Sequence, residues 1–74
     1  MQKNFSEQYL AGQSFAKQDL RDASFRNARL AGADFSGADV RGVDFASADL
    51  RCARFCGARL GRTRWPATVL HLGV

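Results

Sequence analysis

The stretch ADFSGADVRG, residues 33–42, contains one five-residue unit twice: alanine, aspartate, a large apolar residue, and two further residues ending in glycine. The unit continues in both directions along the chain. Every position whose number is a multiple of five carries a large apolar residue, from Phe5 to Leu70. The positions two residues earlier are small and apolar from Ala23 to Ala58. A period of five therefore organises almost the whole sequence.

This period fits neither a helix nor a straight strand. In an α-helix, steps of five place successive large residues about 140° apart, so no apolar face forms. In a straight strand, the odd spacing sends successive large residues to opposite faces. The pattern instead predicts a chain that bends once per repeat, with the small and large residues directed inward and a corner at the last two positions. Five repeats end in glycine, which suits a corner with positive φ: Gly12, Gly32, Gly37, Gly42 and Gly57.

The large residues alternate between Phe and Leu or Val, and this alternation favours four repeats per coil. Four sides stack like residues on like, whereas an odd number would stack Phe on Leu. The predicted columns are Phe5, Phe25, Phe45 and Trp65; Leu10, Leu30, Leu50 and Leu70; Phe15, Phe35 and Phe55; and Leu20, Val40 and Leu60. A spacing of twenty also predicts four opposite-charge rungs that help to fix the register: Arg29–Asp49, Asp34–Arg54, Asp39–Arg59 and Asp44–Arg64.

The runs 33–37, 38–42 and 48–52 resemble the A-(D/N)-(L/F)-x-x motif of pentapeptide-repeat proteins. The resemblance covers about residues 3–65. It implies an all-β fold, a right-handed quadrilateral β-helix of about three and a half coils, with residues 1–65 as one domain. Residues 1–20 depart from the motif, with glutamine in the small-residue column at Gln8, Gln13 and Gln18. We expect them to form a degenerate capping coil whose polar side chains bond the open end.

Residues 66–74 are apolar almost throughout and are expected to form a C-terminal cap or a dimerisation tail. Pro66 at a corner would end or redirect the coil. In a continued coil, Val69 and Leu72 would face outward, and such an apolar patch is usually covered. The resemblance implies end-to-end pairing through the C-termini, so the expected partner is a second copy; a lid over the chain's own last coil is the alternative. The candidate self-association interface is Trp65, Val69, Leu70, Leu72 and Val74.

The net charge of +4 and pI of about 9.8 permit attraction to nucleic acid or anionic membranes without selecting either partner. A candidate basic patch consists of Arg51, Arg54, Arg59, Arg62 and Arg64, with no acidic residue after residue 50. Nucleic-acid contact is the weaker alternative, because three of these arginines have aspartate partners in the expected rungs. Some pentapeptide-repeat proteins bind DNA gyrase as mimics of duplex DNA, so the resemblance also allows this role. It is less favoured, because it needs a long acidic rod and this chain is short and basic.

The remaining features argue against an enzyme, a cofactor or a small-molecule substrate. The only histidine, His71, lies in the apolar tail, and no Ser/His/Asp or Cys/His constellation surrounds it. Cys52 and Cys56 are too few for a disulfide framework and form only weak evidence for a metal site. No run approaches the roughly 20 apolar residues of a membrane span, and the N-terminus leads into no signal peptide, so the expected location is the cytoplasm. The sequence thus predicts a non-enzymatic scaffold or protein-interaction module with an unknown partner.

Overall fold

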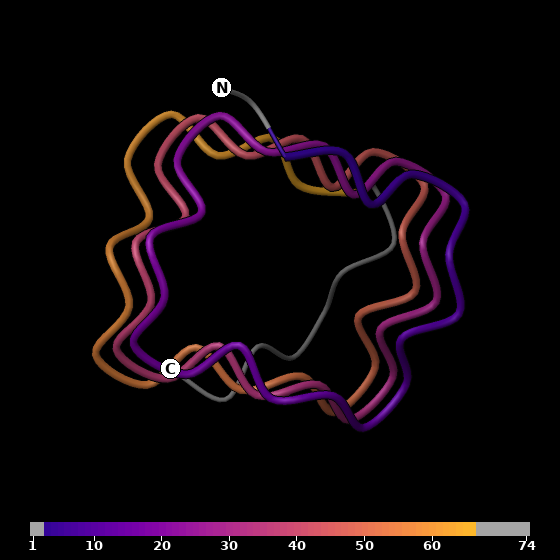
Figure 1. The fold of residues 1–74 in the computed structure, drawn as a ribbon, viewed down its shortest axis with the longest axis horizontal. Helices are drawn as coiled ribbons and strands as arrows, with labels where there is room; N and C mark the ends of the chain where they lie inside the picture. Colours follow the sequence, from indigo (N-terminus) through magenta and orange to yellow (C-terminus); the bar gives the residue numbers. More distant parts are fainter. Residues whose placement is uncertain (1–2, 67–74) are drawn as a thin grey trace.

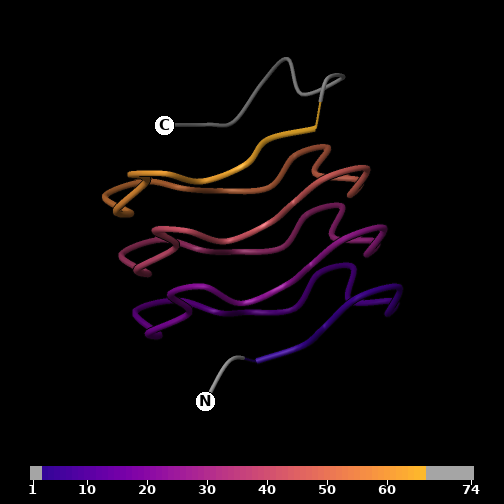
Figure 2. The same ribbon diagram turned by 90° about the horizontal axis from the view of Figure 1, so that it is seen from above.

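The computed structural model describes residues 3–66 and shows a right-handed quadrilateral β-helix. Viewed along its axis, the chain traces a four-sided outline that repeats with each coil (Figure 1). Seen from the side, the coils lie one above another from the N-terminus to the C-terminus (Figure 2). The described residues form no helix and no extended strand. Their regular structure consists of isolated parallel bridges between residues twenty apart, from Asn4–Ser24 to Asp44–Arg64.

Each corner is a tight turn closed by a backbone hydrogen bond. The N–H of Ala38, for example, donates to the carbonyl of Phe35 at 3.0 Å. The last residue of the repeat has a φ between 60° and 75° at all twelve described corners, as in a type II turn. The predicted positive φ is therefore confirmed. Glycine occupies five of these corners, and seven other residues, such as Asn27, accept the same conformation.

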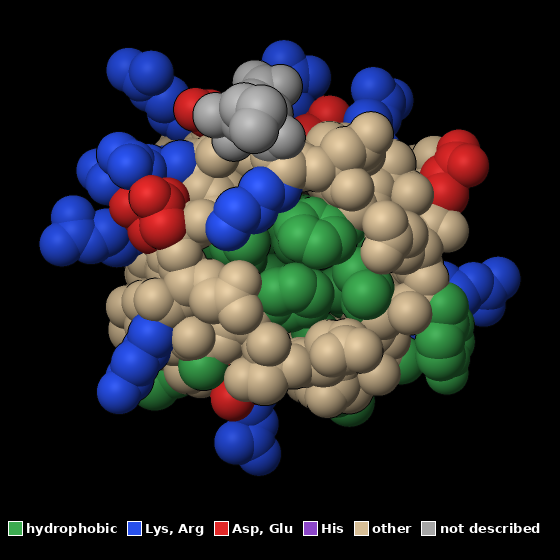
Figure 3. All heavy atoms as spheres, in the orientation of Figure 1, with side chains coloured by type: hydrophobic (Ala, Val, Ile, Leu, Met, Phe, Trp, Pro, Cys, Tyr) green, Lys and Arg blue, Asp and Glu red, His purple; other side chains and the backbone are tan. Residues whose placement is uncertain are grey.

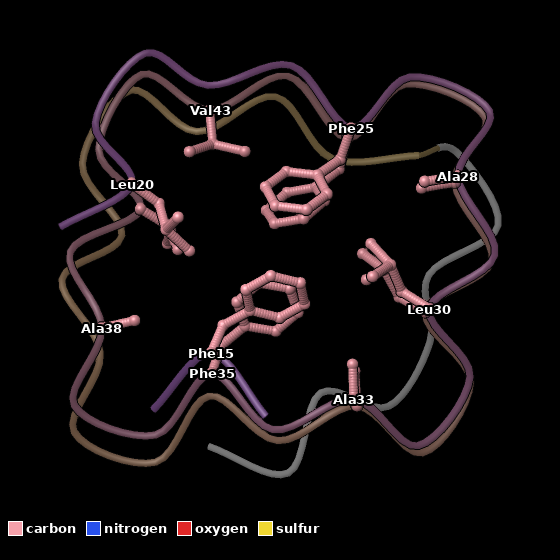
Figure 4. Packing of buried hydrophobic residues seen from close by; sticks show 14 of the residues in the cluster. Phe15, Leu20, Phe25, Ala28, Leu30, Ala33, Phe35, Ala38 and Val43 are labelled. Carbon is pink, nitrogen blue, oxygen red and sulfur yellow. The ribbon is translucent and has the colours of Figure 1, made fainter. Parts of the chain in front are cut away.

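The core consists of two phenylalanine columns that face each other and two columns of Leu or Val between them (Figure 4). Phe35 is fully buried and stacks on Phe15 and on Phe55, with ring centroids 5.0 Å apart in both pairs. Its edge meets Phe25 at 5.7 Å and Phe45 at 5.6 Å. Because like residues stack on like at a spacing of twenty, the predicted four-sided coil is confirmed.

The predicted charge rungs have the right register but not the predicted contacts. Asp34 and Arg54 are bridge partners in the backbone, as are Asp39 and Arg59. Within the described residues, however, none of the four rungs brings its charged groups within 4 Å. Asp39 instead pairs with Arg41, two residues later, at 2.6 Å.

The reason lies in the local hydrogen bonding of the aspartates. Asp34 Oδ1 accepts the backbone N–H of Ser36 at 2.9 Å, and Asp44 Oδ1 accepts that of Ala46 at 2.9 Å. This bond orients the carboxylate along its own chain, toward the corner, and away from the coil above. The aspartate of the repeat is therefore a turn-stabilising residue, a role that pairing by charge alone does not predict.

At the N-terminal end, one side chain bonds the backbone of the open coil, while the predicted capping role of residues 1–20 stays a prediction. Lys3 Nζ donates to the backbone carbonyl of Asp19 at 3.2 Å, which satisfies one acceptor at the open end. The side chains of Gln8, Gln13 and Gln18 are exposed and make no hydrogen bond within residues 3–66. At the other end, residues 67–74 lie outside the described residues, so the choice between cap and dimerisation tail stays a prediction.

Candidate functional site: the final coil

The net charge of the protein is concentrated in the final coil, residues 47–66. Residues 3–46 carry six basic and six acidic side chains, whereas the final coil carries five arginines against the single carboxylate of Asp49. The whole excess of +4 therefore lies within one turn of the solenoid, at its C-terminal end. This end of the solenoid therefore differs from the body in its net charge, although both have the same repeat structure.

The five arginines form a ring, not a patch on one side. Each is exposed, and they are distributed around the coil. Arg54 lies on the face centred on Phe55, Arg59 on that of Leu60 and Arg64 on that of Trp65, while Arg51 and Arg62 lie at corners.

Most of this ring is not neutralised by nearby carboxylates. Only Arg51 has a carboxylate within 4 Å among the described residues, with Nη2 2.9 Å from Asp49 Oδ2. That contact, led by the Arg51 side-chain hydrogen bond, lowers the pKa of Asp49 below its ordinary value. Arg54, Arg59 and Arg64 come within 4 Å of none of the aspartates one coil below, because the carboxylates of those aspartates bond the backbone of their own corners.

In the body of the solenoid, three aspartates pair with arginines: Asp19, Asp39 and Asp44. Asp39 accepts two hydrogen bonds from the Arg41 guanidinium and lies 3.8 Å from Arg21 Nε. The Arg41 side chain is the main cause of the lowered pKa of Asp39, which falls to about 2. Such pairs neutralise part of the positive charge of the body, whereas four of the five arginines of the final coil have no carboxylate within 4 Å among residues 3–66.

The final coil also carries backbone groups that find no hydrogen-bond partner within residues 3–66. In the coil below, Val40 N–H donates to the carbonyl of Arg59 and Gly42 N–H to that of Gly61, both at 3.0 Å. The equivalent donors one coil later are the N–H groups of Leu60 and Arg62, and residues 3–66 supply no acceptor for either. These groups, together with the equivalent groups of the other repeats in the final coil, are called the C-terminal edge below. Such an edge can template the addition of another chain.

Of the predicted self-association interface, Trp65 alone lies in the described residues. Its ring stacks on Phe45 at 5.4 Å and meets the ring of Phe55 edge-on at 5.1 Å. It thus ends one aromatic column and is only partly buried. Val69, Leu70, Leu72 and Val74 lie outside the described residues, so this interface stays a prediction.

The described residues offer little for catalysis. They contain no group of three His, Cys, Asp or Glu side chains that could hold a metal ion. Cys52 and Cys56 are exposed free thiols, with Cys52 at a corner of φ 61°. No polar or charged residue in the part of the chain that is described is buried. Tyr9, in the first coil, is the one strongly exposed large hydrophobic residue there, so no such aromatic accompanies the arginine ring. The described part also contains no helix long and apolar enough to cross a bilayer.

Comparison with known proteins matches the repeat directly. The model of the family described as "Pentapeptide repeats" matches residues 9–45 and 23–62, with eight copies of the repeat. The solved structure of a pentapeptide repeat protein, Rfr23, from the cyanobacterium Cyanothece 51142 is similar at 28% identity and a TM-score of 0.78, over 84% of this chain and 43% of that one. A pentapeptide repeat protein of the Arabidopsis thaliana thylakoid lumen is 33% identical over 96% of this chain and 56% of that one, with a TM-score of 0.49.

This chain therefore spans only about half the length of these two proteins. A search of curated proteins found no match. The unbroken repeat, the four-sided coil and the match of the family model to more than half of the chain agree. The chain belongs to the pentapeptide-repeat family.

Proposed function

We propose that this protein is a non-enzymatic scaffold, a protein-interaction module that associates with a second copy through its C-terminal end. Pentapeptide-repeat proteins have a structural repeat fold that is generally non-enzymatic. The observation that carries the proposal is the C-terminal edge, where Leu60 and Arg62 present N–H groups that have no acceptor within residues 3–66. An open β edge is a ready surface for another chain.

The interior and the sides of the solenoid support the same conclusion. The interior is filled by aromatic and aliphatic columns, so a partner must contact the sides or the ends. Along residues 3–46 the side chains balance in charge, and pairs such as Asp39–Arg41 are internal to the protein. Within residues 3–66, the final coil combines cations that have no carboxylate partner with backbone N–H groups that have no acceptor, which favours it as the surface that binds a partner.

Replacing two apolar residues of the tail tests the proposal. We expect the double variant Val69→Asp and Leu72→Asp to remain folded and to become monomeric, because two carboxylates would be desolvated in the contact. Light scattering at high micromolar concentration gives the mass, and circular dichroism gives the folded state. A matched control, Ala31→Asp and Ser36→Asp, adds the same charges to the sides of the middle coil and should associate like the wild type.

Three other results would argue against the proposal. A wild-type protein that is monomeric at high micromolar concentration would contradict self-association. A double variant that associates like the wild type would place the contact elsewhere. A double variant that unfolds would instead show that the tail is a lid on its own coil.

A second candidate function is contact with nucleic acid. The observation in its favour is that Arg54, Arg59, Arg62 and Arg64 have no carboxylate within 4 Å among the described residues, so they could neutralise phosphates. Salt-sensitive retention on a DNA column, reduced by Arg59→Gln with Arg62→Gln, would support this function. No shift in a gel assay at low salt would exclude it, and a pull-down with and without nuclease separates the two kinds of partner.

A further inference from the structure

We propose that the C-terminal edge of one copy binds the N-terminal edge of another, so that copies stack head to tail. This inference rests on the proposed self-association and names the surface that receives the C-terminal end. It follows from the direction of the hydrogen bonds between coils, from the charges of the two end coils and from the apolar residues at the two ends.

The ladder between coils is polar along the solenoid axis. Among the described residues, 17 of its backbone N–H groups donate toward the C-terminus and 9 donate toward the N-terminus. In each repeat, the central residue and the last corner residue donate upward, as Phe35 does to Arg54 and Gly37 to Cys56. The residue before the centre donates downward, as Arg54 does to Ala33. Each repeat therefore sends two N–H groups upward for every one downward.

The two ends of the solenoid are consequently complementary and not alike. Counted within residues 3–66, the C-terminal edge presents two donors per acceptor, for example the N–H groups of Leu60 and Arg62 beside the carbonyl of Ala58. The N-terminal edge presents two acceptors per donor, for example the carbonyls of Ser14 and Ala16 beside the N–H of Ser14. Head-to-tail stacking can pair these groups as they are paired between coils. Two C-terminal edges facing each other would leave surplus donors unpaired, and buried unpaired donors are costly.

Charge favours the same arrangement. The first coil, residues 3–22, carries three basic and three acidic residues, whereas the final coil carries a net +4. Contact between two final coils would bring two arginine rings together, and like charges at short range repel. Contact between a final coil and a first coil opposes a cationic ring to a neutral surface.

The ends also match in shape and in apolar character. Phe5 and Leu10 at the N-terminal end, and Leu60 and Trp65 in the final coil, are only partly buried. One end of the solenoid, shown in Figure 3, has hydrophobic side chains at its centre and charged side chains projecting from its rim. The exposed glutamines of the first coil form no hydrogen bonds within the described residues that would close this end. Stacking a second copy would bury apolar centres of the same four-sided outline.

The experiment blocks the N-terminal edge and measures mass against concentration by sedimentation. The variant Tyr9→Pro with Ser14→Pro removes two N–H groups that point out of this edge and places proline at an edge, where it is tolerated. The control variant Ala11→Pro with Ala31→Pro places proline at the first corner position, which Pro66 occupies naturally. The N–H groups of Ala11 and Ala31 have no partner within residues 3–66, so the control leaves the ladder intact.

Head-to-tail stacking predicts that the wild type and the control associate, with a mass that grows beyond the dimer because the contact is heterologous. The N-terminal-edge variant should be monomeric. Mixed with Val69→Asp/Leu72→Asp, it should form a one-to-one complex, because one intact edge of each kind remains. An N-terminal-edge variant that associates like the wild type would overturn the inference. If that happens and the variant Val69→Asp/Leu72→Asp is still monomeric, the proposed self-association through the C-terminal end stands without the head-to-tail arrangement.

Two variants of opposite charge provide a second test if the proline variant does not fold. Gln8 and Gln13 are exposed in the first coil, so their substitution should leave the core intact. Gln8→Glu with Gln13→Glu should strengthen association with the arginine ring, and Gln8→Lys with Gln13→Lys should weaken it. If both variants associate equally, head-to-tail contact is contradicted. If the wild type itself does not associate, the proposed function is contradicted as well.

Discussion

Phe35→Ala is expected to be among the most damaging single substitutions, because Phe35 lies at the middle of the aromatic core. Its side chain is fully buried, and its ring contacts four others: Phe15 and Phe55 by stacking, Phe25 and Phe45 by their edges. Truncating a buried Phe to Ala costs about 3 to 5 kcal/mol. A domain of this size has a total stability of roughly 4 to 11 kcal/mol. The variant should therefore lose about a quarter of its stability or more.

The matched variant is Phe5→Ala, at the end of the neighbouring column. Phe5 is only partly buried and has two ring neighbours, Phe25 at 4.8 Å and Phe15 at 5.7 Å. Less apolar surface returns to water and no closed cavity forms, so we expect a loss of no more than about 2 kcal/mol.

Urea unfolding followed by circular dichroism and by the fluorescence of Trp65 measures both losses. Trp65 stacks on Phe45, so its emission reports on the same column system. At about 4 to 8 °C per kcal/mol, the melting temperature of Phe35→Ala should fall by more than about 12 °C. Equal losses at the two positions, or a loss below about 1 kcal/mol at Phe35, would refute the account of a continuous aromatic core.

Three further predictions concern the corners and the paired aspartates. Gly42→Ala should destabilise more than Gly32→Ala in urea: both have φ near 75°, which costs alanine about 1 to 2 kcal/mol, but only at Gly42 would the new Cβ overlap a neighbour, the Asp22 carboxylate. Asp39→Asn should keep more stability than Asp39→Ala, because the amide oxygen can still accept the N–H of Arg41; equal urea midpoints would contradict the turn-stabilising role. The pKa of Asp39 is lowered from 3.8 to about 2, so its ionised form stabilises the protein fully above pH 3.8, and that stability is lost as the pH falls toward 2; acid titrations of Asp39→Asn should show a shallower loss in this window.

Much of the fold could be predicted from the sequence, because the two inward positions of each repeat carry one kind of residue each, small at one and large and apolar at the other. The Phe and Leu alternation indicated four sides, and the stacking of Phe35 on Phe15 and Phe55 confirms it. Glycine at the end of repeats indicated corners with positive φ. Residues such as Asn27 show that the corner imposes this conformation even without glycine.

The surface could be predicted less well, because charge pairing depends on where side chains point. Spacing placed Asp34 beneath Arg54 correctly, yet the bond between the Asp34 carboxylate and the backbone N–H of Ser36 directs that carboxylate elsewhere. The same effect leaves Arg54, Arg59 and Arg64 without the aspartate contacts that the sequence pattern predicted for them. An aspartate two residues before a corner amide was the signal that could have indicated this, since such residues favour local turns.

The most direct test of a functional C-terminal end is the amide spectrum of the wild-type protein measured at low and high concentration. At 8.1 kDa, its backbone amides can be followed individually by nuclear magnetic resonance. On association, the amides of Leu60 and Arg62 should shift and gain protection from solvent exchange, while those of the buried middle coil, such as Val40, should stay unchanged. Changes confined to the sides of the solenoid, or no change at any concentration, would contradict association through the C-terminal end.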